Sequence, residues 1–299
     1  MAMATGRRFE ACGNLEKVDD LPPPLLPDWS SLQTDVLAVV LSFLPVRERF
    51  RAGSVCQKWR RASLDPGCWT EADLMDVQTK ISGKVTRAVI VRSRGQLRSL
   101  SIRFCSDQLL EFIGAQCPLL EKVKIDEVKE GDLTLLNKLF EPSIDSIQRF
   151  VQGCRRIRSL HLFFLIWVER SREEFTEMVR VLISGFPNLV SLYLDVSAVR
   201  CTEVQMVVRC EVLKIDIDDI RFIIEHLPNL ECLVLKRAQV TDAVLDVIGR
   251  GMPNLRSLSL LYCGYLTRGG LRALQAARKD LHVTMKRCMK GEYDAEFVW

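Results

Sequence analysis

The sequence predicts an α/β fold in two parts, a short module of three helices followed by a curved array of strand–helix repeats. One observation behind this is a helical apolar stripe between residues 30 and 69. The other is a ladder of leucine-like residues that recurs from about residue 94 onward. The length of 299 residues suits the division, because an average domain has roughly 150 residues.

The first part is a helical module. Apolar residues recur on one face of its first helix, at Leu32, Val36, Leu37, Val40, Leu41 and Leu44. Ser30 and Gln33 fit a capping box at the start of this helix, and Pro45 ends it. Two shorter helical pieces follow, the second with Val55 and Trp59. A unit of about forty residues buries little surface, so we expect part of the stripe to dock on something else.

The second part repeats the pattern L-x-x-L-x-L. Its anchor triplets are Leu97/Leu100/Ile102, Leu120/Val123/Ile125, Ile157/Leu160/Leu162, Leu189/Leu192/Leu194, Leu230/Leu233/Leu235 and Leu255/Leu258/Leu260. A weaker unit holds Cys210, Leu213 and Ile215, and a last strand with Val283 and Met285 closes the array. Seven units begin between positions 97 and 255, an average period of about 26 residues, typical of a leucine-rich repeat. The two long intervals, after residues 120 and 157, contain expected helical segments at 132–140 and 171–182.

Alternation within each strand assigns a direction to every side chain. The anchors point into the array and the residues between them point outward, while helices at 107–113 and 241–248 return the chain to the next strand. Stacked repeats then share one continuous core. The outward positions at which a partner would be recognised are Arg103, Lys124, Asp126, His161, Phe163, Tyr193, Asp195, Lys214, Asp216 and Lys236. Asp195 and Asp216 beside Lys236 would suit a small basic element; the alternative is that all are solvated surface residues.

The segment from Lys80 to Arg103 is basic, with no acidic residue between Asp76 and Asp107. Two interpretations stay open: the segment grips an acidic or phosphorylated substrate, or it is the exposed seam between the two parts.

The 11 cysteines include no CxxC pair, which excludes zinc ribbons, RING fingers and thioredoxin-like motifs. Cys105, Cys263 and Cys288 each follow a repeat strand by the same step, and Cys117 precedes a proline at a helix end. We therefore expect these four to be small buried residues of the repeat, not redox or metal groups.

Composition narrows the function classes further. A net charge of +4 provides little of the field that a dedicated nucleic-acid binder needs. The longest apolar run, Leu162 to Val168, is far short of the roughly 20 residues of a membrane span. The N-terminal residues lack a secretory pattern. We expect a protein of the cytoplasm, the nucleus or both, with neither nucleic acid nor membrane as a partner.

No residues suggest catalysis. The three histidines, His161, His226 and His282, have no nucleophile at a recognised motif spacing. The run Ser82-Gly83-Lys84 lacks the earlier glycine of a phosphate-binding loop. We expect no catalytic residue, no cofactor and no metal site.

Residues 32–69 resemble an F-box. The positions that match are Leu32, Asp35, Val36, Leu37, Leu41, Leu44-Pro45, Arg47, Glu48, Val55-Cys56, Trp59-Arg60-Arg61 and Trp69. One departure is Gln33, where the family usually has proline. The repeats, with their Cys-x-Asp and Cys-Pro-x-Leu steps, resemble those of F-box/leucine-rich-repeat proteins, and VRSRGQLRSLSI is similar to plant Skp-interacting members.

The resemblance implies a three-helix F-box followed by a right-handed leucine-rich-repeat solenoid, with its parallel β-sheet on the concave face and helices on the convex face. The expected divisions are a flexible lead-in (1–28), the F-box (29–75), a connecting segment (76–93), the repeats (94–290, about seven or eight) and a C-terminal cap or tail (291–299).

The resemblance also implies a non-catalytic substrate receptor of an SCF-type ubiquitin ligase. The F-box would bind a Skp-type adaptor, and through it cullin and RING subunits, while the repeats hold an unidentified protein substrate. Carried onto this sequence, the adaptor-binding residues are Leu32, Asp35, Val36, Leu37, Val40, Leu41, Leu44, Pro45, Val55 and Trp59. Trp59 has a second interpretation, as a core residue that fixes the three helices. Two other functions stay open: a protein-binding scaffold without a ligase, and a hormone-type small-molecule receptor.

Overall fold

A computed structural model describes residues 32–103, 105–126, 142–167, 172–202, 205–211, 213–286, 288 and 296–297. The helix expected at 132–140 lies outside these residues, and so do the lead-in and most of the C-terminal tail.

The described chain opens with three helices, α1 (Thr34–Ser42), α2 (Val46–Ala52) and α3 (Gln57–Ser63), followed by the 3-10 helix η1 (Pro66–Trp69). The predicted capping box is wrong in its Gln33 half. Gln33 is the N-cap residue of α1, in extended conformation and without a side-chain cap hydrogen bond, while Ser30 lies outside the described residues. Pro45 separates α1 from α2 as predicted and stands at the N-cap of α2.

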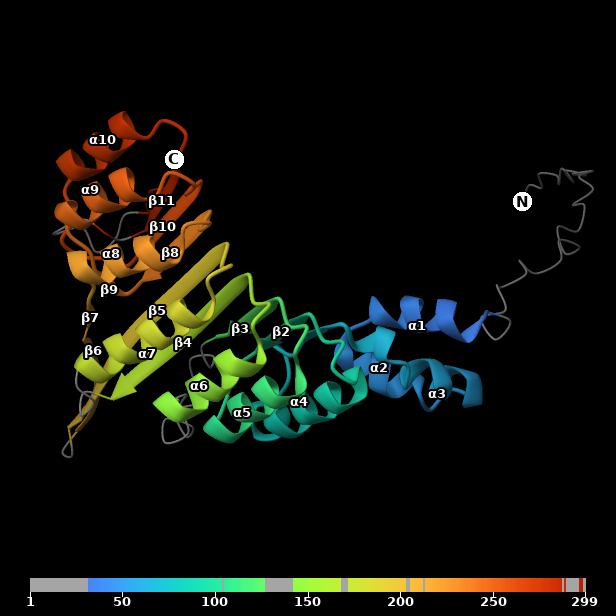
Figure 1. The fold of residues 1–299 in the computed structure, drawn as a ribbon. Coiled ribbons are helices and arrows are strands. Elements are labelled where there is room, and N and C mark those ends of the chain that lie inside the picture. Colours follow the sequence, from blue (N-terminus) through green and yellow to red (C-terminus); the bar gives the residue numbers. More distant parts are fainter. Residues whose placement is uncertain are drawn as a thin grey trace, which may run out of the picture.

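A parallel sheet forms the second part. Its strands, in spatial order, are β1 (Glu71–Asp73), β2 (Ser99–Ile102), β3 (Lys122–Ile125), β4 (Ser159–Trp167), β5 (Ser191–Thr202), β8 (Cys232–Lys236), β10 (Ser257–Leu261) and β11 (His282–Lys286). Two strands are antiparallel additions, β6 (Gln205–Glu211) beside β5 and β12 (Glu296–Phe297) beside β11. The pair β7 (Leu213–Lys214) and β9 (Ala238–Gln239) forms a separate small sheet. Figure 1 shows the strands side by side along an arc.

The helices of this part follow the same arc on one side of the sheet (Figure 1). They are α4 (Thr79–Ser93), α5 (Asp107–Gln116), α6 (Ile144–Gly153), α7 (Arg172–Gly185), α8 (Ile217–His226), α9 (Asp242–Gly251) and α10 (Arg268–Ala277). Each packs on the next, and strands alternate with helices along the chain except between α7 and α9, where β6, β7 and β9 are added. This confirms the predicted α/β class with a parallel sheet and helices.

The strand register explains the periodic leucines. Leu100, Val123, Leu160 and Leu192 stand opposite one another on successive strands, and Leu233, Leu258 and Val283 continue the row. All are buried, because neighbouring strands cover the apolar ladder that a single strand would leave in water.

The four singled-out cysteines are all buried, which confirms their prediction as core residues. Two of them also link neighbouring repeats. The Cys263 thiol donates to the Leu235 carbonyl at 3.2 Å, and the Cys288 thiol donates to the Leu260 carbonyl at 2.9 Å. Burial raises the pKa of Cys117 to about 12, so it stays a thiol.

The joint between the helical module and the sheet is built around Trp69. Its ring is fully buried, its indole N–H donates to the Ser63 carbonyl at 2.8 Å, and its centroid lies 4.9 Å from that of Phe50. From α4, the Arg92 guanidinium lies over both rings, 4.1 Å from the Phe50 centroid and 5.3 Å from that of Trp69. Stacking of this kind fixes α4 against the module.

Arg49 closes the same joint from inside. Its side chain is buried and donates to the carbonyls of Leu44 at 2.7 Å, Cys68 at 2.9 Å and Glu71 at 2.6 Å. Burial lowers the pKa of Arg49. Glu71 begins β1, so the sheet starts inside the range expected for the F-box, and the expected connecting segment contains α4.

Candidate interaction surfaces

The first candidate surface is an exposed apolar strip on α1. It consists of Val36, Val39, Val40 and Phe43, with exposed fractions of 45%, 58%, 36% and 83%. Spacings of three and four residues place these side chains on one face of the helix. Exposed aliphatic and aromatic side chains gathered in this way mark a contact surface.

The opposite face of α1 belongs to the core of the module. Leu37 and Leu41, which the sequence placed in the adaptor contact, have an exposed fraction of 0%. A side chain without exposed surface cannot touch a partner in this conformation, and this corrects the prediction for these two residues. The single predicted stripe is therefore two stripes, one that holds the module together and one that faces solvent.

The remaining predicted adaptor residues differ in exposure. Asp35, Pro45 and Val55 are exposed. Leu32, Leu44 and Trp59 are half-buried and pack against the core. For Trp59 this fits its interpretation as a core residue, although part of the ring still reaches solvent.

The second candidate surface is the outward face of the sheet, near the middle of β3, β4 and β5. The Lys124 ammonium lies 3.0 Å from the Asp126 carboxylate, and Asp126 lies 3.8 Å from His161 Nε2. The rings of His161 and Tyr193 stack, with centroids 3.6 Å apart and planes at 14°. Burial lowers the pKa of His161 to about 4, although Asp126 opposes the shift. The imidazole is therefore neutral at pH 7.

Further along the same face, Asp195 holds two cations. Arg237 donates two hydrogen bonds to the Asp195 carboxylate, from Nε at 2.8 Å and from Nη2 at 2.6 Å, and the Lys236 ammonium lies 2.8 Å from the same carboxylate. Arg237 has a φ of 56°, the left-handed conformation that directs its side chain back toward Asp195. The Asp195 carboxylate has no exposed surface, so it organises Lys236 and Arg237 and cannot itself meet a basic element of a substrate, contrary to the prediction.

The other predicted substrate residues do not gather at this point. Asp216 is the N-cap of α8, where its side chain accepts from the backbone N–H groups of Asp218 and Asp219. Lys214 lies in β7, in the small separate sheet. The expected pairing of Asp195 with Asp216 around Lys236 is therefore wrong.

Arg103 lies half-buried just past the end of β2, and its Nε has no hydrogen-bond partner in the described chain. Phe163 is in β4 opposite Asp195, and its side chain is outside the described set. Three arginines of the predicted basic segment make contacts within the chain: Arg87 stacks on Phe112, Arg92 on Phe50, and Arg98 pairs with Glu121 at 2.6 Å.

Sequence reasoning missed three residues of these surfaces. Val39 and Phe43 lie outside the stripe that was counted, yet they repeat Val36 at helical spacing, and this second stripe was the available signal. Arg237 follows the end of β8, and no sequence pattern indicates its left-handed backbone.

None of the described helices is long and apolar enough to cross a membrane. Within the described residues, no group of three or more histidine, cysteine, aspartate or glutamate side chains could hold a metal ion.

Comparison with known proteins finds one domain match in this chain. The model of the F-box domain matches residues 29–71, the range that contains α1, α2, α3 and η1. These residues are therefore similar to an F-box domain.

Several curated proteins are similar to this chain. "F-box protein SKIP1" of Arabidopsis thaliana is 23% identical over 275 residues, 80% of each chain. "Putative F-box/LRR-repeat protein 22" of Arabidopsis thaliana is 24% identical over 244 residues, 79% of this chain and 69% of the relative. Human "F-box/LRR-repeat protein 12" is 30% identical over 101 residues, 31% of each chain. The chain is thus similar over most of its length to F-box and F-box/LRR proteins of a plant.

A solved structure of the yeast Rad7 and Elc1 complex also matches, at 15% identity, with coverage of 88% of this chain and 89% of that chain. Its TM-score of 0.28 is too low to establish a shared fold.

Proposed function

We propose that this protein is the substrate-recognition subunit of an SCF-type ubiquitin ligase. In this proposal the F-box binds a Skp-type adaptor, and the strand–helix array is a leucine-rich-repeat solenoid that holds a protein substrate for ubiquitination. In the same proposal the chain acts as a non-catalytic subunit of the ligase. The single observation that carries the proposal is the exposed α1 apolar strip within the matched F-box domain.

The strip has the properties of a helix-in-groove contact. Its members recur at spacings of three and four residues, and they are supported from behind by the buried Leu37 and Leu41. Among the residues that the structure describes, Phe43 is the most exposed large apolar side chain. Burial of such a ring in a partner contributes about 2 kcal/mol, so we expect Phe43 to be a main anchor of the contact.

The substrate would be held on the outward face of the sheet. The Lys124–Asp126 pair, the His161–Tyr193 stack and the Asp195 cluster lie on neighbouring strands. Each is already fixed by its neighbours within the chain, so little side-chain entropy is lost when a partner docks.

Adaptor binding tests the proposal directly. The full chain, its Phe43→Asp variant and its Val36→Asp variant are titrated against a purified Skp-type adaptor by biolayer interferometry. We expect wild type to bind and Phe43→Asp to lose about 2 kcal/mol, or roughly thirtyfold in Kd. Val91→Asp is the matched control, because Val91 is 63% exposed but lies on α4, outside the F-box.

The outcomes are distinct. Failure of wild type to bind the adaptor contradicts the ligase proposal. Equal binding by wild type and Phe43→Asp places the contact elsewhere on the module. A Leu41→Asp variant answers a different question, since Leu41 is buried: we expect it to lose cooperative melting together with binding.

A further inference from the structure

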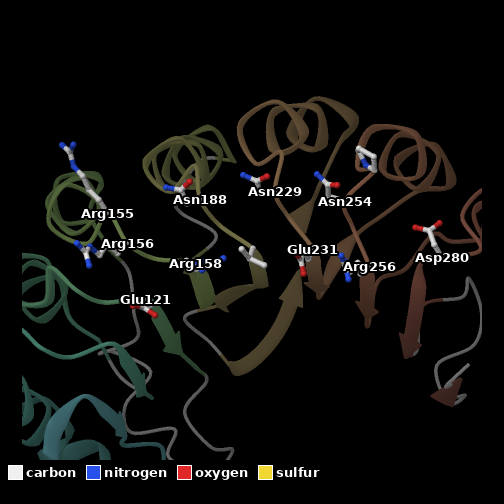
Figure 2. Close-up of a pocket in the computed structure, with 12 residues that line it drawn as sticks. Glu121, Arg155, Arg156, Arg158, Asn188, Asn229, Glu231, Asn254, Arg256 and Asp280 are labelled. Atoms are coloured by element: carbon white, nitrogen blue, oxygen red, sulfur yellow. The ribbon is translucent and has the colours of Figure 1, made fainter. Parts of the chain in front are cut away.

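A polar groove runs along the edge of the sheet where the strands begin, away from the α1 strip and the middle of the sheet. It has a volume of about 1010 Å³ and is lined from β3 to the start of β11. In Figure 2, Asn188, Asn229 and Asn254 stand in a row on successive helix-to-strand loops. Arg155, Arg156 and Arg158 gather at one end of the groove (Figure 2).

The arginine cluster departs from the repeat. The loops before β5, β8 and β10 read Phe-Pro-Asn-Leu, Leu-Pro-Asn-Leu and Met-Pro-Asn-Leu, whereas the loop before β4 reads Cys-Arg-Arg-Ile-Arg. Arg155 and Arg156 stand at the second and third of these positions, where the other loops have proline and asparagine. The other repeats form the same turn without the two arginines, so the fold does not require these cations.

The structure gives the side chains of these three arginines no partner among the residues it describes. Arg155, Arg156 and Arg158 are exposed, and their side chains make no ion pair or hydrogen bond with any described residue. Three acidic residues line the groove. Glu121 is paired with Arg98 at 2.6 Å and Asp280 with Arg278 at 2.8 Å, while Glu231 lies beside Arg256, away from the three arginines (Figure 2). This end of the groove therefore carries uncompensated positive charge.

We propose that this groove binds an acidic segment of a partner polypeptide. The arginine guanidinium groups at the β4 end of the groove bind carboxylates of the segment in bidentate contacts. The amides of Asn188 and Asn229, which are exposed along the groove, form hydrogen bonds with the main chain of the segment. Neighbouring strands are about 4.8 Å apart, so the five spacings from β3 to β11 span roughly 24 Å, the length of about seven extended residues.

The site goes beyond the proposed function, because it shares no residue with the adaptor strip or with the middle of the sheet. It would give the protein a second point of contact with a partner, selected by charge.

Fluorescence anisotropy with a labelled peptide of alternating glutamate and serine, roughly ten residues long, tests the site on the full chain. Single-stranded DNA of equal charge is the second probe. We expect wild type to bind the peptide, more weakly as salt rises, and Arg156→Glu/Arg158→Glu to weaken binding at least about tenfold. Arg60→Glu/Arg61→Glu on α3 is the matched control, with the same change of charge at exposed positions, and should bind as wild type does.

Peptide binding that is equal in wild type and Arg156→Glu/Arg158→Glu overturns the proposal. So does equal weakening by the α3 control, which would indicate an effect of net charge only, or tighter binding of the DNA than of the peptide at the same arginines. Adaptor titration of Arg156→Glu/Arg158→Glu should match wild type, so this proposal can fail while the adaptor contact holds.

Discussion

Neutralising Asp195 should destabilise the centre of the sheet. Asp195→Asn keeps the shape of the side chain but removes the charge that holds Lys236 and Arg237 at 2.6–2.8 Å. Removing one partner of a fully buried pair costs about 3–5 kcal/mol. Here the two cations keep about a fifth of their side chains exposed and can regain water, so we expect about 2–3 kcal/mol.

The contact with Asp195 also offsets backbone strain at Arg237. Arg237 adopts a φ of 56°, a conformation that costs a residue with a Cβ atom roughly 1–2 kcal/mol. Its bidentate contact with Asp195 is what holds the side chain in that geometry. Weakening the contact therefore also weakens the turn after β8.

Thermal and urea unfolding, followed by circular dichroism, measure the effect. A loss of 2–3 kcal/mol should lower Tm by roughly 5–10 °C in a chain of this size. Asp126→Asn is the matched control, because Asp126 is a quarter exposed and its pair with Lys124 is at the surface, where such pairs contribute about 0–1 kcal/mol. An Asp195→Asn protein that melts like wild type would refute the reasoning.

Three further predictions concern the packing of the fold and the titration of His161. Leu258→Asp places an unpaired carboxylate at a position with no exposed surface and should cost several kcal/mol and abolish cooperative unfolding; unchanged melting would mean that the repeat register is misplaced. Gly153→Ala directs a methyl group onto the Gly114 backbone where α5 meets α6, so it should lower the free energy of unfolding by about 1–3 kcal/mol in a urea titration. Gly83→Ala is its control, because Gly83 has open space around it, and it should stabilise α4 by up to about 1 kcal/mol. The pKa of His161 is about 4 in the folded protein, against an ordinary value of 6.5. The free energy of unfolding present above pH 6.5 should therefore fall by at most about 3 kcal/mol as the pH is lowered toward 4. His161→Phe should flatten this decline, and a pH profile identical to that of wild type would contradict the assignment.

The sequence predicted the parallel sheet well because each strand must present an apolar residue at every second position. Leu100 and Leu258 are far apart in the chain, yet they occupy the same row of the sheet and both are fully buried. Period and direction follow from the pattern alone. The burial of Cys263 and Cys288 could be predicted in the same way, since the repeat fixes their position after the strand.

The candidate surfaces were predicted less well, because exposure depends on what packs behind each residue. Leu41 and Val40 are adjacent and similar in hydrophobicity, but the packing of α1 on α3 and η1 leaves Leu41 buried and Val40 exposed. Likewise, Asp216 has the same outward parity as Asp195, and the start of α8 makes it a helix cap. Sequence periodicity gives a side chain's direction and not its neighbours.

The stacking of Arg92 on Phe50 and Trp69 has a consequence for transfer geometry. A flexible tether would let a bound substrate sample many positions, and its effective concentration at a distant reactive group would fall as the tether lengthened. A packed joint instead keeps the α1 strip and the sheet at one separation and one angle. Under the proposed function, a lysine of the substrate would be modified or spared according to its position on the substrate's surface, and a shift of the docking register along the sheet would change which lysine is reached.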